Sequence, residues 1–429
     1  MKLFAFGSNG SGQLGIGHTE DVSIPTQCQF TTLANGDEIV QIAAGGNHTL
    51  VRTREGHVYA AGCNTDGRCV PESQLTSNDQ IETTNADIED RGKTTPYTSE
   101  DESLLLRFRR VIFTDPVSGP TIETFKCISA TWEGSILVAG VSTSDTGGSD
   151  RREDRVFVLG SSPKGELGLG QTFSSTQVRT TGTSLPNFPP QGSRVVALGS
   201  GMSHTVAVLA NGDVYGWGGS RKGQLGESLK AQKIVWAPAR VEGIPFRATG
   251  AVCGREFTVV FGQRDRGEFV VLGDPANRWG ITKIPDYLRS KQQESGHSLG
   301  MSGYLDIQAS WHGVYVQVAQ VPSDIPAGEL SAKTLVAWGR DDRGQLPPSD
   351  LPVPAKIAVG SEHVLALLHD GSVAAFGWGE HGNCGADTNS RGDVSGSYKL
   401  IPLPDDVCTH ERRVVGLGAG CATSWLIVD

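Results

Sequence analysis

The sequence lacks an excess of positive charge and any long apolar run. Its 37 lysines and arginines stand against 47 aspartates and glutamates, a formal net charge of −10, so no general attraction draws it to nucleic acid or to an anionic membrane. The opening apolar residues, 1–6, are too few for a signal-peptide core, and no later stretch could span a bilayer. We therefore expect a soluble cytoplasmic protein, with the nucleus open as a second location, and no direct nucleic-acid or membrane partner.

The sequence also lacks clustered metal ligands and recognisable reacting groups. The eight cysteines are scattered, without a C-x-x-C pair or a histidine spaced to complete a zinc site. The glycine-rich loops are not followed by the Lys and Ser/Thr of a P-loop, and no Ser-His-Asp, Cys-His or paired-carboxylate arrangement stands out. We expect no metal, no cofactor and no catalytic residue, and we predict that the chain is not an enzyme.

Glycine, by contrast, is abundant at 56 residues, and it recurs in a repeated sequence motif that has two halves. The clearest copy covers residues 195–227. Its first half is apolar and β-prone, with a small-residue turn just before His204, and its second half is a strand that ends in a glycine-rich loop. Between them, Asn211 and Gly212 are predicted to supply the two positive-φ residues of a type I′ turn, so the two halves should meet in an antiparallel hairpin.

Each half of this motif occurs seven times. The first halves lie at 42–51, 128–137, 195–209, 251–260, 307–316, 357–366 and 417–426, and the second halves at 4–15, 58–67, 156–168, 213–226, 270–280, 335–346 and 373–385. A lone unit of about four short strands cannot bury both of its faces, so such units pack radially on their neighbours. The sequence predicts an all-β fold: a seven-bladed β-propeller of four-stranded blades, built as a single domain from residues 1–429.

The two ends of the sequence indicate how the ring closes. The seventh copy of the first half ends at residue 429, whereas the first copy of the second half begins at residue 2. The repeat is therefore interrupted where a hairpin turn would lie. We expect the N- and C-terminal strands to pair within one blade, which removes two free strand edges. Three stretches interrupt the repeat: an acidic insertion at 72–102, predicted to be disordered, and loop insertions at 142–155 and 282–302, the last with a short helix at 285–294.

One position of the repeat lies in the turn that precedes the second strand of each blade. Its occupants are Gly46, Trp132, Met202, Arg255, Trp311, Ser361 and Cys421, and the next position holds Asn47, Glu133, Ser203, Glu256, His312, Glu362 and Ala422. Because equivalent turns recur at one end of every blade, both sets are expected around one mouth of the central channel.

Trp132, Arg255 and Trp311 are the predicted partner-binding residues, since Trp and Arg are enriched in interface hot spots. Their predicted rim consists of Glu133, Glu256, His312 and Glu362. The alternative is that each tryptophan folds back to plug the channel or to cover its own blade. Because Trp132 and Trp311 lie three blades apart, we do not expect their rings to form an excitonic pair.

His48, His204 and His363 share one position at the start of the second strand in three blades. We interpret them as structural residues, each donating a hydrogen bond to a backbone carbonyl of a neighbouring blade. The other blades carry Gly134, Phe257, Gly313 and Thr423 at this position, which does not fit a metal-ligand set.

The pairing of Gly-x-x-His-Thr at 201–205 with Trp-Gly-x-x-x-x-Gly-Gln-Leu-Gly at 217–226 resembles the regulator-of-chromosome-condensation repeat family. A narrower likeness, based on the N-terminal segment 4–21 and on the variant turns at 130–134 and 309–313, is to the fungal alpha-tubulin suppressor family. That resemblance implies a non-catalytic scaffold that binds a small CSL-type metal-binding protein. It also implies support for diphthamide synthesis on elongation factor two and for Elongator-dependent tRNA wobble-uridine modification, with Elongator itself open as a partner.

Two other functions fit the same repeat family. The main alternative is a guanine-nucleotide exchange factor for a Ran-like GTPase, which is the activity of the family's founding member. A further alternative is recruitment of substrates for ubiquitin ligation or trafficking. It needs a catalytic domain that is either fused in this chain, where none is present, or supplied by a partner.

Overall fold

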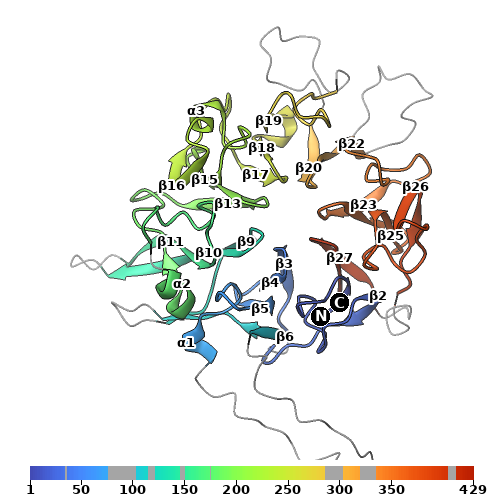
Figure 1. The fold of residues 1–429 in the computed structure, drawn as a ribbon, viewed down its shortest axis with the longest axis horizontal. Coiled ribbons are helices and arrows are strands. Elements are labelled where there is room, and N and C mark those ends of the chain that lie inside the picture. Colours follow the sequence, from blue (N-terminus) through green and yellow to red (C-terminus); the bar gives the residue numbers. More distant parts are fainter. Residues whose placement is uncertain are drawn as a thin grey trace, which may run out of the picture.

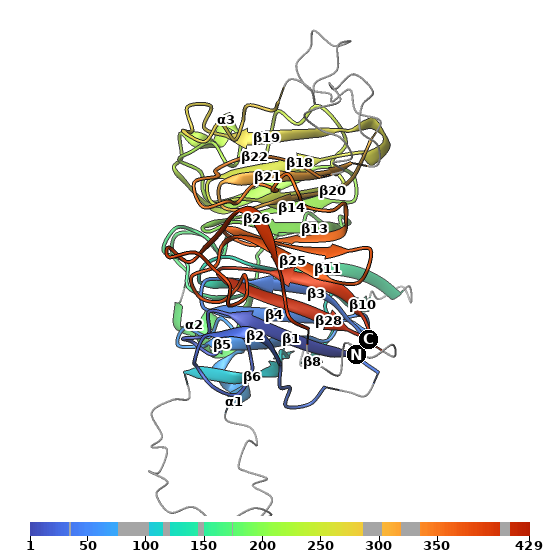
Figure 2. The same cartoon turned by 90° about the vertical axis from the view of Figure 1, so that its right-hand side faces the viewer.

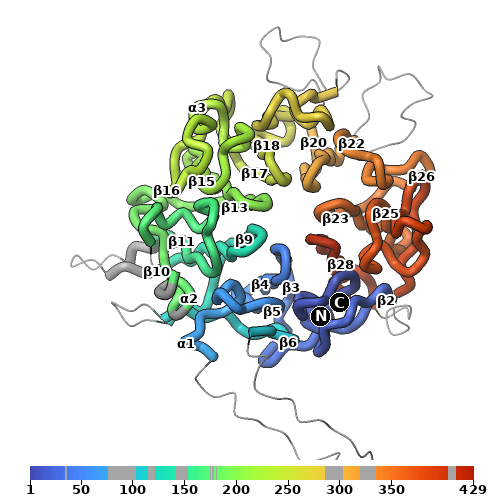
Figure 3. The backbone as a smooth tube through the Cα atoms, viewed as in Figure 1, coloured from blue at the N-terminus to red at the C-terminus, as the bar shows by residue number. Residues whose placement is uncertain are grey.

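The strands of the chain form a ring of seven sheets around a common centre (Figure 1). This computed structural model describes residues 1–33, 36–75, 103–114, 121–144, 150–173, 175–285, 303–318, 335–403 and 412–429. The innermost strands of the sheets face the centre, and the tube view shows the chain passing from blade to blade in sequence order (Figure 3). The predicted seven-bladed β-propeller is thus confirmed.

The first four blades have four strands each. Blade 1 consists, from the outside inward, of β2 (Val22–Gln27), β1 (Lys2–Gly7), β28 (Thr423–Val428) and β27 (Val414–Ala419). Blade 2 runs outward through β3 (Ile39–Ala44), β4 (His48–Thr53), β5 (Val58–Cys63) and β6 (Leu104–Arg110). Blade 3 contains β9 (Cys127–Ala130), β10 (Gly134–Ser144), β11 (Asp150–Gly160) and β12 (Thr183–Ser184). Blade 4 contains β13 (Val195–Ser200), β14 (His204–Leu209), β15 (Val214–Gly219) and β16 (Ile234–Arg240).

Blades 5 and 6 differ from the prediction, because each has three strands within the described residues. These are β17 (Gly250–Cys253), β18 (Phe257–Phe261) and β19 (Phe269–Gly273), and then β20 (Tyr304–Ala309), β21 (Gly313–Val318) and β22 (Leu335–Gly339). Blade 7 has four: β23 (Pro354–Val359), β24 (His363–Leu368), β25 (Val373–Trp378) and β26 (Asp393–Leu400). Between blades lie the hairpin of β7 (Phe113–Thr114) and β8 (Thr121–Ile122), the helices α1 (Glu72–Leu75), α2 (Ser175–Thr181) and α3 (Glu227–Lys230), and a 3₁₀ turn, η1 (Arg264–Arg266).

The predicted closure of the ring is present in blade 1. β1 pairs antiparallel with β28 over six residue pairs, from Lys2 with Val428 to Gly7 with Thr423. The two termini therefore lie next to each other at one face of the disc (Figure 2). Because β1 and β28 are the two middle strands of this blade, neither has an unpaired edge.

The core of the protein lies between the blades rather than within any one of them. One cluster joins Leu3 and Leu14 of blade 1 to Val51, Tyr59 and Phe108 of blade 2, all of them buried. Equivalent clusters join blades 2 and 3, 3 and 4, 4 and 5, 5 and 6, and blades 6, 7 and 1. Each blade thus buries its apolar faces only in the presence of its neighbours, as expected of a repeat architecture.

The hairpin of blade 4 forms as predicted, but its turn is of a different type. The Gly212 N–H donates to the Leu209 carbonyl at 2.8 Å, and the Leu209 N–H donates to the Asp213 carbonyl at 2.8 Å. Gly212 has a φ of +92°, whereas Asn211 does not have a positive φ. This is a type I turn followed by a left-handed glycine, so the predicted type I′ turn is wrong.

The structure changes the description of two insertions. Most of the stretch 142–155 belongs to β10 and β11, which pair from Gly134 with Gly160 to Ser144 with Asp150, so a long hairpin replaces the predicted loop. In the acidic insertion, residues 72–75 form α1, and 76–102 lie outside the described residues. Residues 286–302 of the third insertion, including most of the predicted helix, also lie outside them.

Candidate functional site

The turns that precede the second strands meet around the central channel. Their backbones are linked from blade to blade: the N–H of Gly46 donates to the Trp132 carbonyl at 3.0 Å, and that of Trp132 donates to Met202 at 3.0 Å. On the other side of the ring, the N–H of Arg255 donates to Trp311 at 3.1 Å, and that of Trp311 to Ser361 at 2.9 Å. The loops that follow the third strands lie at the same end of the blades, since Gly313 at the start of β21 pairs with Gly339 at the end of β22. We call this end of the propeller the mouth face.

Trp132 and Trp311 meet at the mouth of the channel although they come from blades 3 and 6. Their ring centroids are 5.7 Å apart at an interplanar angle of 43°. The Arg255 guanidinium lies 5.5 Å from the centroid of Trp311, within cation–π range. We call these three residues the mouth cluster. The expectation that three blades would keep the two indoles apart is wrong, because the rings reach across the channel.

A cavity of about 160 Å³ lies in the channel beside the mouth cluster. Its lining comes from all seven blades and includes Gly45, Ala130, Ser200, Cys253 and Gly360 as well as both tryptophans. These small residues leave room for the indoles. A Cβ on Gly46 would lie 2.7 Å from two ring carbons of Trp132, so only glycine lets that ring lie across the turn of blade 2. The tryptophans thus narrow the channel and still remain half-buried rather than fully enclosed.

The indoles of the mouth cluster differ from those of the core. Trp217 is fully buried and donates its N–H to the Glu166 carbonyl of the preceding blade at 2.8 Å, and Trp338 donates in the same way to Ile281 at 2.8 Å. In the part of the chain that the structure describes, the N–H groups of Trp132 and Trp311 have no such acceptor. A half-buried indole with a free donor is typical of a residue available to a binding partner.

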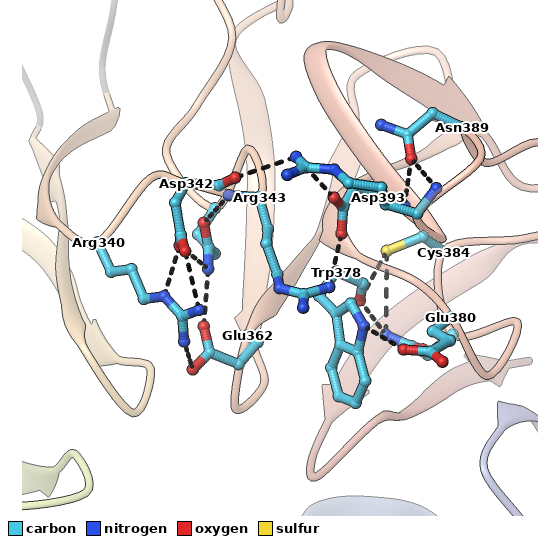
Figure 4. A network of polar contacts seen from close by, with 12 residues as sticks. Arg340, Asp342, Arg343, Glu362, Trp378, Glu380, Cys384, Asn389 and Asp393 are labelled. Atoms are coloured by element: carbon cyan, nitrogen blue, oxygen red, sulfur yellow. Dashed lines mark hydrogen bonds and ion pairs between the residues drawn. The ribbon is translucent and has the colours of Figure 1, made fainter.

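Two of the predicted rim residues form a buried polar cluster beside Trp311. Glu362 accepts a hydrogen bond from Arg340 at 2.9 Å (Figure 4). It also accepts hydrogen bonds from His312 Nδ1 at 3.0 Å and from Gln345 at 2.8 Å. Burial alone would raise the pKa of Glu362, but the hydrogen bonds from His312 and Gln345 and the charge of Arg340 hold that pKa below its usual value. The carboxylate therefore stays ionised and ties blade 6 to blade 7.

This cluster corrects the predicted role of Glu362. The residue is 5 % exposed and both of its carboxylate oxygens are occupied, so it supports the turns of the mouth and does not form an open rim contact. Glu256 is exposed at blade 5, and Glu133 is half-buried at the edge of a separate pocket between blades 2 and 3. Of the predicted binding residues, the structure brings Trp132, Arg255 and Trp311 together, with His312 and Glu362 beneath them.

The three structural histidines join neighbouring blades, but through hydroxyl groups. The Nε2 atoms of His48, His204 and His363 lie 2.9, 3.0 and 2.9 Å from the hydroxyl oxygens of Ser135, Thr258 and Ser424. The partner at Nε2 is therefore a side-chain hydroxyl of the next blade, where a backbone carbonyl was predicted. Backbone groups of that blade, at Phe257 and Thr423, also interact with His204 and His363. Burial lowers the pKa of His48 to about 3 and those of His204 and His363 to about 4, so all three are neutral at physiological pH.

Sequence reasoning missed the aromatic and basic residues of the neighbouring loops. Trp279 lies in the glycine-rich loop of blade 5, with its ring 6.4 Å from that of His312. Trp378 ends β25 in blade 7 and lies under Arg343, whose guanidinium is 5.8 Å from the ring centroid. The sequence analysis assigns these loops no role in binding. For Trp378 the available signal was a tryptophan at a position where other copies carry a small or polar residue, such as Ser8, Ser161 and Gly219. Trp279 instead takes the position that is leucine in other copies, such as Leu14, Leu167 and Leu225.

In the described ranges there is no group of three or more His, Cys, Asp or Glu side chains positioned to hold a metal ion. Nor does any helix in those ranges have the length and apolar character needed to cross a membrane.

Comparison with known proteins agrees with the repeat and the fold. The regulator of chromosome condensation (RCC1) repeat matches residues 2–52 and 211–261, and a second form of it matches residues 39–68 and 195–224. The RCC1 repeat is thus present in residues 2–68 and 195–261 of this seven-bladed propeller. An RCC1 repeat-containing protein of Schizosaccharomyces pombe is 28% identical to this propeller over 100% of the chain and 99% of its own length. The narrower likeness to the fungal alpha-tubulin suppressor family is not shown by these matches.

Two further proteins bear on activity and on fold. The mouse secretion-regulating guanine nucleotide exchange factor is 26% identical to the propeller, over 97% of the chain and 82% of its own length. The crystal structure of Prp20p from Saccharomyces cerevisiae, described with its binding to Gsp1p and histones, superposes with a TM-score of 0.67. It covers 99% of this chain and 90% of Prp20p at 16% identity, which shows a shared fold.

The name of the mouse relative overturns the prediction that this chain is not an enzyme. That prediction rested on the lack of reacting side chains, which excludes enzymes that make or break covalent bonds. Nucleotide exchange is a catalysed reaction in which no covalent bond changes. A surface without a nucleophile or a general base is therefore compatible with such catalysis, and the exclusion was wrong.

Proposed function

We propose that this propeller is a guanine nucleotide exchange factor for a small GTPase of the Ran type, which it binds through the mouth face. The observation that carries the proposal is the match, over nearly the whole chain, to a relative named as an exchange factor. The mouth cluster supports it, because two half-buried tryptophans beside an arginine form the kind of compact anchor that dominates protein interfaces.

The chemistry of exchange fits such an anchor. An exchange factor accelerates nucleotide release by binding the nucleotide-free GTPase more tightly than the nucleotide-bound form, so the required property is differential affinity. Trp132 and Trp311 supply apolar area and two free N–H donors at one point of the surface. Glu362 and His312 hold the Trp311 turn in place through the bond between them. The propeller itself needs no moving part for this step.

Mixing the purified chain with a Ran-type GTPase loaded with a fluorescent GDP analogue should accelerate release of the analogue when unlabelled GTP is in excess. Trp311→Ala is expected to lower the acceleration by about 30-fold, since truncation of a hot-spot tryptophan costs about 2 kcal/mol or more. Trp132→Ala should have a similar effect. Stopped-flow fluorescence at a fixed concentration of propeller measures both.

The matched control for these variants is Trp236→Ala. Trp236 is half-buried in β16, an outer strand of blade 4 that is remote from the channel, so this substitution removes an indole without touching the mouth. Its release rate should equal that of the wild type. If the wild-type chain leaves the release rate unchanged, exchange activity on this GTPase is excluded.

A second candidate function uses the same surface. The turns Ala130–Gly134 and Ala309–Gly313, which carry the two tryptophans, are among the features that resemble the fungal alpha-tubulin suppressor family, together with the segment 4–21. We infer from this resemblance that the partner of the mouth cluster is a small CSL-type metal-binding protein of diphthamide synthesis. In this alternative the propeller supports diphthamide formation on elongation factor two and Elongator-dependent tRNA modification.

Size-exclusion chromatography separates the two candidates. The chain and a zinc-loaded CSL-type protein should elute as one complex if the second candidate is right, and Trp132→Ala with Trp311→Ala should return them to two peaks. Separate elution at micromolar concentrations of both wild-type proteins would rule this candidate out. A complex that forms without any acceleration of nucleotide release would favour it over exchange.

A further inference from the structure

A continuous series of arginine–tryptophan contacts extends outward from the mouth cluster. The Arg278 guanidinium lies 4.4 Å from the ring centroid of Trp279, and that of Arg340 lies 5.4 Å from the same ring. Trp279 is 6.4 Å from His312, the residue next to Trp311. We call Arg255, Trp311, Trp279, Arg278 and Arg340 the arginine–tryptophan arc. It covers blades 5 and 6 on the mouth face.

The arc is a special feature of this part of the surface. All four arginine–tryptophan stacking contacts found in the described residues lie on the mouth face, within blades 5, 6 and 7. The pocket between blades 2 and 3 at the same face is lined instead by Asp66, Glu72 and Glu133, with Arg179 as its only basic residue. Within the described residues, arginine–tryptophan stacking is thus confined to blades 5 to 7, while the pocket between blades 2 and 3 is mainly acidic.

The arginines of the arc fall into two groups. Arg340 is paired with Asp342 and Glu362, and the nearby Arg343 is paired with the buried Asp393 (Figure 4). Arg255 and Arg278 form no ion pair with any residue in the described part of the chain, and each lies against an exposed or half-buried indole. These two guanidinium groups are therefore free to accept an anionic partner.

We propose that the arginine–tryptophan arc binds a short acidic segment of a protein partner, with carboxylates on Arg255 and Arg278 and apolar side chains against Trp311 and Trp279. The proposal deepens the function proposed above and shares its premise that the mouth face is the binding surface. Guanidinium groups stacked on indoles present their N–H edges outward, which suits bidentate contact with carboxylates.

The charge distribution favours a protein segment over a nucleic acid. A chain with a net charge of −10 repels a polyanion at long range, and only two arginines of the arc are free of carboxylate partners. Phosphate backbones are bound by extended rows of unpaired cations, and their affinity falls steeply with salt. A segment with two or three carboxylates and interspersed apolar side chains matches both the number of free charges and the half-buried indoles of Trp311 and Trp279.

Fluorescence anisotropy with the full-length chain tests the proposal without any GTPase. The probe is a fluorescein-labelled twelve-residue peptide in which Asp and Glu alternate with Phe and Leu, and its counterpart carries Asn and Gln in place of the acids. The acidic peptide should bind, and the double variant Arg255→Gln, Arg278→Gln should weaken that binding about tenfold or more, since two charge-assisted contacts are lost. Trp279→Ala should weaken it as well.

Arg266→Gln is the matched control, because Arg266 lies in η1 at the opposite end of blade 5 and is 67% exposed. It should bind the acidic peptide like the wild type. The proposal is overturned if the uncharged peptide binds equally well, if Arg266→Gln weakens binding as much as the double variant does, or if a single-stranded oligouridylate displaces the peptide at equal concentration. If the acidic peptide binds but nucleotide release is not accelerated, the proposed role of the arginine–tryptophan arc is supported and the proposed exchange function is excluded.

Discussion

Lowering the pH from 7 to 5 is expected to destabilise the propeller by about 5 kcal/mol, because three buried histidines must remain uncharged in the folded state. The folded pKa is about 3 for His48 and about 4 for His204 and His363, below the ordinary value of 6.5. At pH values between the folded pKa values and 6.5, the unfolded chain binds up to three protons that the folded chain does not. The stabilisation is therefore complete above pH 6.5 and is lost as the pH falls from 6.5 towards 4. Urea unfolding at pH 7.5, 6.5, 5.5 and 5.0 measures it.

Replacing the three histidines by glutamine isolates this effect. Glutamine does not titrate, and its amide can still hydrogen-bond to the hydroxyl groups of Ser135, Thr258 and Ser424. The triple variant should be less stable than the wild type at pH 7.5 but nearly insensitive to pH between 7 and 5. Carboxylates such as Glu362, whose pKa is lowered, affect stability only at lower pH. A triple variant that lost stability as steeply as the wild type would show that other groups are responsible.

Deleting residues 1–7 is expected to open the ring and to cost about 6 kcal/mol or more, a large part of the stability of a typical domain. The deletion removes β1, whose Leu3, Phe4 and Phe6 are all buried, and leaves both β2 and β28 without their shared partner. Thermal unfolding followed by circular dichroism should shift to lower temperature, and limited proteolysis should cut first within blade 1.

Two companion variants test the mechanism of this loss. Removal of Met1 alone, which is 40% exposed, should leave the melting temperature unchanged. A circular permutant that joins residue 429 to residue 2 through a short linker, with new ends in the exposed turn at 210–212, should keep the wild-type fold, because Lys2 and Val428 are already paired. A truncated chain that melted together with the wild type would show that the ring does not depend on β1.

The sequence was sufficient to predict the blades and their closure, because both follow from local patterns. Alternating apolar residues, a turn residue such as Gly212 and a repeated hairpin define a blade, and the count of copies defines the ring. The type of the turn was mispredicted since Asn-Gly is compatible with more than one backbone path. Gly212 takes the left-handed conformation in either case, whereas the φ of Asn211 decides between them.

The site could be predicted only in part, because its key contacts cross the ring. The repeat alignment placed Trp132 and Trp311 in equivalent turns, but the distance between them depends on how far two indoles reach over a narrow channel. Glu362 appeared exposed from its position in a turn, yet Arg340 and Gln345 from the preceding blade cover it. Such contacts depend on the path of loops in neighbouring blades, which no local pattern in the sequence records.

The pairing of β1 with β28 also has a consequence for how the protein is made in the cell. A ribosome adds about 5–20 residues per second, so Leu3 waits on the order of tens of seconds before Ile427, its partner, has been synthesised. Until then β1 lacks its partner β28, and its apolar side chains are not buried in a complete sheet. Blade 1 can therefore be completed only after β28 has been synthesised, long after β1.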